Sequence, residues 1–173
     1  MTKQDHAAIV VFTSETRQAI LEKGGSGEWV LSPKNAARRH YLVCCRREHW
    51  ENRAEGIAQK AAFMIGRIAN LKKVDASENE RGQPRYLIQI SEYTELNLPG
   101  IWGKGRAADL RNPVVYETLA QLGIELRGLK FKPMPKPIGK PVEGASLTIA
   151  EAKKALAATF GVKPEDIEIT IRG

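Results

Sequence analysis

The chain has 173 residues, enough for one ordinary domain with a real hydrophobic core plus a small appendage. Hydrophobic content of 42% and charged content of 27% are globular values, and no apolar run approaches the roughly twenty residues of a membrane-spanning helix. The net charge of +7 and the pI near 9.5 favour an acidic partner such as nucleic acid or another anionic surface.

Cysteine usage and the start of the chain predict a reducing cytoplasm and no membrane attachment. The first residues lack the apolar region of a signal peptide. Cys44 and Cys45 are adjacent, so on a strand they point to opposite faces and cannot pair with each other. Neither a disulfide framework nor a four-ligand metal site can be assembled, and we predict no metal and no cofactor.

The first thirty residues predict a strand, a helix and a second strand. Residues 8–12 have the composition of a short buried strand, and Thr13 or Ser14 is suited to cap a helix over residues 15–23. The glycine-rich run at residues 24–27 follows a helix and lacks Gly-Lys-Ser/Thr, so we interpret it as a flexible turn and not as a phosphate loop. Residues 29–31 are predicted to form a brief strand.

A basic stretch follows at residues 34–47, which hold five cationic side chains and no acidic one. Its apolar centre, residues 41–45, predicts an interior strand with Arg38 and Arg39 before it and Arg46 and Arg47 after it. Two interpretations remain open: the arginines are solvated strand ends, or they form a basic rim that follows a phosphate backbone.

Residues 48–60 are polar and predict a loop or a short surface helix. The next two apolar stretches, residues 61–74 and 85–93, predict two strands joined by a polar turn. Gly66 inside the first of these indicates a bulge or a close backbone approach.

A long loop at about residues 94–111 contains the strongest functional pattern. A helix is predicted to follow it, with Asn112 as N-cap, Pro113 at the first helical position and Gly123 just past the end. Trp102, with Tyr93 or Trp50, is a candidate to stack on a base. Three cationic side chains near the helix N-terminus are candidates to contact phosphates: Lys104, Arg106 and Arg111. The alternatives stay open: Trp102 anchors its loop to the core, and Arg111 pairs with Asp109 or Glu117.

The C-terminal part predicts a separate small unit. One more strand is predicted within residues 124–131, and four prolines then mark residues 132–144 as a stiff linker between a domain at 1–131 and a unit at 145–173. In that unit a capping box, Thr148 to Glu151, starts a helix, and Ile167, Ile169 and Ile171 alternate as in a strand. About thirty residues cannot bury enough apolar surface alone, so we expect this unit to dock on the domain, a second copy or a partner.

Catalytic signatures are scarce. The three histidines show no metal-ligand spacing, no G-x-S-x-G elbow is present, and the cysteines lie in an apolar strand where a thiol is usually inert. We nominate no catalytic residue.

Taken together, AIVVFTS, FMIGRI, LIQISEY, RNPVVYETLAQLGI and the ending LTIAEAKKALAATFGVKPEDIEITIRG resemble a family of uncharacterised bacterial proteins that brings no activity to carry over. The order of strands and of the proline-started helix is distantly similar to the PUA-like superfamily, especially its EVE and ASCH branches. That resemblance implies a small β-barrel that binds RNA or modified DNA bases, often through an aromatic-lined pocket.

The sequence therefore predicts an α+β protein: a mainly antiparallel, PUA-like β-barrel with peripheral helices, plus a C-terminal helix–strand unit. The first functional hypothesis is binding of RNA or DNA, including a modified base, through the aromatic and basic residues named above. The second is an adaptor or oligomerisation protein acting through residues 145–173. The third is a hydrolase or toxin acting on nucleic acid.

Overall fold

The computed structural model describes residues 6–78, 82–104, 113–135 and 149–169. The chain divides into two compact units, Met1–Pro137 and Ile138–Gly173, and each is described by itself. The division falls inside the stretch that the prolines mark as a linker. Among the described residues, no helix is long and apolar enough to cross a membrane.

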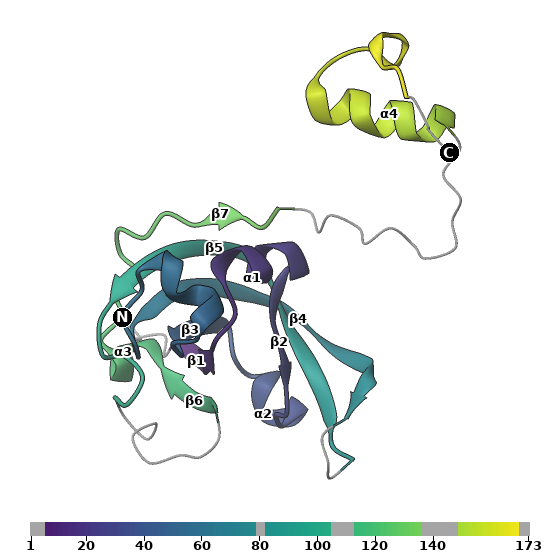
Figure 1. The fold of residues 1–173 in the computed structure, drawn as a ribbon. Coiled ribbons are helices and arrows are strands. Elements are labelled where there is room, and N and C mark those ends of the chain that lie inside the picture. Colours follow the sequence, from purple (N-terminus) through teal and green to yellow (C-terminus); the bar gives the residue numbers. More distant parts are fainter. Residues whose placement is uncertain (1–5, 79–81, 105–112, 136–148, 170–173) are drawn as a thin grey trace. The chain divides into compact units, whose positions relative to one another are not determined.

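The first unit is built on one curled sheet (Figure 1). Its strands are β1 (Ala7–Thr13), β2 (Gly25–Trp29), β3 (Tyr41–Arg46), β4 (Ala62–Glu78), β5 (Pro84–Leu98), β6 (Val114–Thr118) and β7 (Lys132–Pro133). The order across the sheet is β2-β5-β4-β3-β1-β6, and β7 pairs with β5. The predicted α+β class with mainly β structure is confirmed. The sheet is mixed and not purely antiparallel, because β1 and β3 are parallel neighbours while the other recorded pairs are antiparallel.

Strand β3 lies at the centre of the core, and all six of its residues are buried. Because successive side chains of a strand point to opposite faces, Tyr41, Val43 and Cys45 pack in one hydrophobic cluster. Leu42 and Cys44 pack in a second cluster on the other face. The predicted interior strand and the opposite orientation of the two cysteines are both confirmed.

The longest strands, β4 and β5, form the predicted antiparallel hairpin. Gly66 lies where a side chain cannot: a Cβ there would be 2.5 Å from Ile90 Cδ1. The prediction for Gly66 was a bulge or a close backbone approach; the close neighbour is instead the Ile90 side chain, and a register shift of β4 follows directly, between Arg67 and Ile68.

The glycine-rich run is not a flexible turn. Gly24 ends helix α1 (Arg17–Lys23) in the left-handed conformation, and β2 begins at the next residue and pairs with β5. A Cβ on Gly25 would lie 2.0 Å from the Ile88 carbonyl oxygen, so glycine lets this strand approach β5 closely. The strand therefore precedes the position predicted for it and ends at Trp29. Helix α1 is capped by the Thr16 side chain and not by Thr13 or Ser14.

The prediction of a helix that starts at Pro113 is wrong for the first half of that helix. Residues from Val114 form β6, which pairs with β1, and the helix α3 (Leu119–Leu122) begins only after Thr118. Thr118 and Gln121 form a reciprocal capping box, so Asn112 is not the N-cap of this helix. Gly123 does end α3 in the left-handed conformation, as predicted.

Residues 124–131 contain no strand, which corrects another prediction. They pack Leu126, Leu129 and Phe131 against the first cluster, and only then does the two-residue β7 join the edge of β5. Two short helices complete the unit: α2 (Pro33–Ala36) and the 3-10 helix η1 (Trp50–Glu55). The latter is the short surface helix expected within residues 48–60.

The second unit contains the predicted helix as α4 (Ile149–Phe160), followed by a 3-10 turn, η3 (Pro164–Asp166). Thr148 of the predicted capping box lies outside the described residues. The predicted terminal strand is not formed over residues 167–169, and its last part is outside the described range.

Candidate functional site

Two of the three aromatic residues predicted to stack on a base, Trp102 and Tyr93, lie in the core. Trp102 is 8% exposed, and its ring stacks on Phe12 at 4.9 Å between centroids and 8° between planes. Tyr93 is also buried, beneath the Lys132 ammonium group, which lies 4.7 Å from the ring centroid. The alternative for Trp102, an anchor that fixes its loop to the core, is therefore correct.

The prediction that the arginines of the basic stretch lie at the surface is wrong for Arg46, because its side chain is fully buried. The guanidinium lies 4.1 Å from the centroid of the Phe63 ring and forms an ion pair with Glu55. It also donates from Nη1 to the Glu15 carbonyl oxygen at 2.6 Å. Burial lowers the pKa of Arg46 from its ordinary value, and the Glu55 carboxylate opposes that shift.

The remaining arginines of the basic stretch lie at the two ends of β3, and a rim along a phosphate backbone stays a prediction for them. Arg38 is exposed and Arg39 is half-buried, with its guanidinium 5.3 Å from the Tyr116 ring centroid. Both precede β3, whereas the exposed Arg47 follows it. At about 3.3 Å per residue the two ends of such a strand are on the order of 20 Å apart. A single phosphate contact cannot span them.

Lys104 is exposed and near α3, since its Nζ is 4.0 Å from the position of a Cβ on Gly123. Arg106, Arg111 and Asn112 lie outside the described residues. The predicted group around Trp102 therefore has only Lys104 as an exposed cation among the residues that the structure describes.

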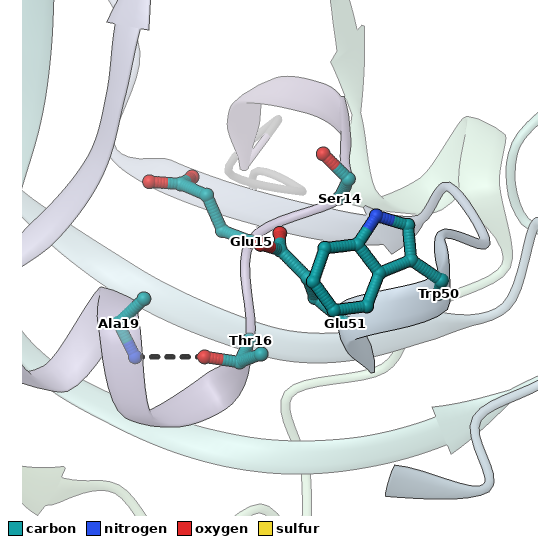
Figure 2. A pocket seen from close by; sticks show the side chains of 6 residues that line it. All are labelled: Ser14, Glu15, Thr16, Ala19, Trp50 and Glu51. Atoms are coloured by element: carbon teal, nitrogen blue, oxygen red, sulfur yellow. Dashed lines mark hydrogen bonds between the residues drawn. The ribbon is translucent and has the colours of Figure 1, made fainter. Parts of the chain in front are cut away.

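A hollow lies elsewhere, at the carboxyl ends of β1 and β3. Parallel neighbours leave a sheet in the same direction, and Thr13 pairs with Arg46 in the last register position, so the segments that follow both strands meet. The hollow has a volume of about 570 Å³ (Figure 2). It is lined by Ser14, Glu15, Thr16, Ala19, Trp50 and Glu51.

A smaller hollow of about 220 Å³ adjoins the first and shares Ser14 and Glu15 with it. Arg47 lines this smaller hollow together with Phe12, Glu28, Trp29 and Pro113. Each hollow has two carboxylates in its lining, Glu15 and Glu51 in the larger and Glu15 and Glu28 in the smaller. Among the described residues, the two linings differ in that only the smaller also contains a guanidinium, that of Arg47.

Buried polar groups hold the walls of the larger hollow together. Asn52, 2% exposed, donates from Nδ2 to the Ser14 carbonyl oxygen at 2.9 Å and to the Arg47 carbonyl oxygen at 3.0 Å. Glu55 accepts from the Arg17 backbone N–H at 2.8 Å as well as from Arg46. The segment after β1, the segment after β3 and the start of α1 are thus fixed to one another.

The two carboxylates at the larger hollow differ in how far they are already engaged. Glu15 accepts from Lys23 Nζ at 3.0 Å, from Thr13 Oγ1 at 3.1 Å and from Ser26 Oγ, and its side chain is 13% exposed. Glu51 is 58% exposed, with its carboxylate 3.5 Å from His49 Nδ1. Glu51 is the carboxylate that has room for a further donor.

Trp50 is the most exposed large hydrophobic side chain among the described residues, at 72%. Figure 2 shows its indole beside the segment that holds Ser14 and Thr16, and the indole lines the larger hollow. The sequence analysis named Trp50 only as a secondary stacking residue. The sequence did indicate that Trp50 is exposed, because this tryptophan lies in a polar segment with no other large apolar residue that would mark a core position.

The two thiols take no part in the site. Burial raises the pKa of Cys45 to about 12, and burial, with the nearby Glu15, raises that of Cys44 well above its ordinary value. Both thiols are therefore protonated at neutral pH, in agreement with the expectation that they are inert.

Searches with this chain against family models, curated proteins and solved structures found no match.

Proposed function

We propose that this protein binds single-stranded nucleic acid at the hollow beyond β1 and β3, with Trp50 as the stacking surface. The observation that carries the proposal is the 72% exposed indole at the rim of a preformed hollow. An indole left in water loses the free energy of burial, and a base stacked on it recovers that loss, typically about 1–3 kcal/mol.

Charge supports the same proposal. The chain carries a net charge of +7, and Arg47 lines the smaller hollow directly beside the larger one. A strand whose base enters the larger hollow can place a phosphate near this guanidinium. Binding then releases counterions and weakens as salt rises, with a slope of about −0.7 for each neutralised phosphate of a single strand.

The PUA-like resemblance is part of this proposal. A curled sheet of seven mainly antiparallel strands with few helices suits a small barrel of that kind. We propose RNA or DNA as the ligand class on the chemistry of the hollow, and the resemblance agrees with it.

The test is fluorescence anisotropy of labelled single-stranded RNA and DNA octamers with the full chain at two or more salt concentrations. Trp50→Ala should weaken binding about 5- to 150-fold, the equivalent of one lost stacking contact, and Trp50→Phe should keep most of the affinity. Arg47→Ala should weaken binding and lower the salt slope by about 0.7.

Arg127→Ala is the matched control for Arg47→Ala, because Arg127 is exposed, lines neither hollow and removes the same charge. Failure to bind any octamer at low salt would end the proposal, and so would unchanged affinity in Trp50→Ala.

A second candidate function is self-association through the C-terminal unit. Ile149, Leu156 and Val162 are 55%, 39% and 46% exposed, an unusual density of open apolar side chains for so small a unit. If two copies of α4 pack antiparallel with Ile149 opposite Leu156, Glu151 lies opposite Lys154, which gives a symmetric interface with paired charges.

Leu156→Lys tests this second candidate by light scattering after size exclusion, since it places a charge at the centre of that interface. Mass that falls from dimer to monomer supports self-association, with Thr159→Lys, an exposed position on the same helix, as control. A wild-type chain that is monomeric at high concentration contradicts it.

A further inference from the structure

The larger hollow also indicates which base it selects, an inference that rests on the proposed function. Its lining offers hydrogen-bond acceptors and hydroxyls, with no cationic side chain among the six residues. A phosphate group would meet two carboxylates there. The adjoining hollow also has two carboxylates, Glu15 and Glu28, but its Arg47 is the one cation among the described residues of either lining, so we assign the phosphate to Arg47 and the base to the larger hollow.

Glu51 is the side chain whose carboxylate can accept hydrogen bonds from a base and so discriminate between bases. Both oxygens of Glu15 already accept from Lys23, Thr13 and Ser26, and that side chain is largely covered. Glu51 is more than half exposed and follows Trp50 directly in η1. Trp50 and Glu51 both line the larger hollow, so a base that enters it and stacks on the indole also meets this carboxylate.

An ionised carboxylate only accepts hydrogen bonds, and it does so best from two neighbouring N–H groups. Guanine presents such a pair, N1–H and N2–H, along its Watson–Crick edge. Adenine and cytosine each present one amino group beside a ring acceptor, and uracil presents one N–H between two carbonyl groups. The donor pattern that fits Glu51 is that of guanine.

We infer that the hollow takes a single unstacked guanine base, lying on the Trp50 indole and donating N1–H and N2–H to the Glu51 carboxylate. The Ser14 hydroxyl, on the segment after β1, also lines this hollow and supplies a donor for the guanine O6. Asn52 fixes that segment to the segment after β3, so little ordering is needed when the base enters.

The experiment compares uridine octamers that contain one central guanosine, adenosine, cytidine, inosine or uridine, with anisotropy as the readout and the full chain as the protein. Wild type should bind the guanosine octamer best. Inosine keeps N1–H and lacks the N2 amino group, so it should bind about tenfold or more weakly than guanosine, as expected for one hydrogen bond to a charged acceptor.

Glu51→Gln should lower the preference for the guanosine octamer over the uridine octamer, measured as the ratio of the two Kd values in the same variant, by about tenfold or more. Glu48→Gln removes the same charge from an exposed position outside the hollow and should keep the preference.

Equal binding of the octamers, a preference for another base, or a preference that survives in Glu51→Gln would each overturn the guanine assignment. In those cases binding itself remains, and with it the proposed function. If no octamer binds, the proposed function fails and the guanine assignment fails with it.

Discussion

The buried pair of Arg46 and Glu55 offers the most direct test of how the hollow is built. Glu55→Ala removes the carboxylate that accepts from both the Arg46 guanidinium and the Arg17 backbone N–H. Arg46 then keeps its charge inside the unit, packed on Phe63, with its carboxylate partner gone.

Removing one partner of a buried ion pair typically costs about 3–5 kcal/mol of unfolding free energy. The Glu55 side chain is 19% exposed, so water can partly replace it, and we expect the lower end of that range, about 3 kcal/mol. Adding Arg46→Met to Glu55→Ala removes the stranded charge and keeps an apolar contact with Phe63. The double variant should therefore recover about half of the loss or more, a coupling of at least roughly 1.5 kcal/mol.

The assay is urea unfolding of the full chain followed by tryptophan fluorescence. All three tryptophans lie in the first unit, so the signal reports on that unit alone. Glu48→Ala is the control: it breaks an ion pair with Arg53 at 3.5 Å in which both side chains are at least half exposed, and it should cost no more than about 0.5 kcal/mol. If Glu55→Ala costs no more than Glu48→Ala, the pair does not hold the hollow together.

Three further outcomes are expected. Trp102→Ala should lower the free energy of unfolding by about 3–5 kcal/mol, measured by heat or urea, because it empties a core position. Trp50→Ala should change it by less than about 0.5 kcal/mol, and similar losses for both variants would contradict their assigned positions. Gly25→Ala should destabilise by about 1–3 kcal/mol in urea unfolding, since its Cβ would overlap the Ile88 carbonyl oxygen, and a neutral result would refute the close approach of β2 to β5. The pKa of Cys45 rises from 9.0 to about 12 on folding, so the unfolded chain loses this proton first as the pH increases. The free energy of unfolding should therefore fall between pH 9 and 12 by up to about 1.4 kcal/mol per pH unit. Cys45→Ala should reduce this slope, and an equal slope in both proteins would contradict the burial of the thiol.

Local patterns were sufficient to predict most of the sheet. The apolar run of β3 and the alternation in β5 each fixed a strand, because those residues bury both faces or one face of the sheet. The prediction of a helix over residues 114–118 was wrong. Asn112-Pro113 is a helix-start pattern, yet Val114, Val115 and Thr118 are β-branched and complete the edge beside β1, and tertiary pairing overrode the local signal.

The candidate site was less accessible to sequence reasoning because its assignment depends on long-range partners. Arg46 resembles its exposed neighbour Arg47 in sequence, and only the fold shows that Glu55 and the Glu15 carbonyl oxygen receive it inside. In the same way, the loop around Trp102 favoured that residue for stacking on a base, although its ring stacks on Phe12 in the core. The polar segment around Trp50 was the local sign that this second indole is exposed. Composition indicated an aromatic and basic surface, and packing decided which residues are available for it.

The amide of Asn52 has a kinetic consequence. It joins the segments on both sides of the larger hollow through two short hydrogen bonds, and its Oδ1 accepts from the His49 N–H at 3.0 Å. Movement of either segment alone would break one of these hydrogen bonds, so we expect the two segments to stay in place when a ligand enters. We expect the association rate of the ligand to be set by diffusion and ionic strength. The lifetime of the complex should then depend on how well the ligand fits the preformed site.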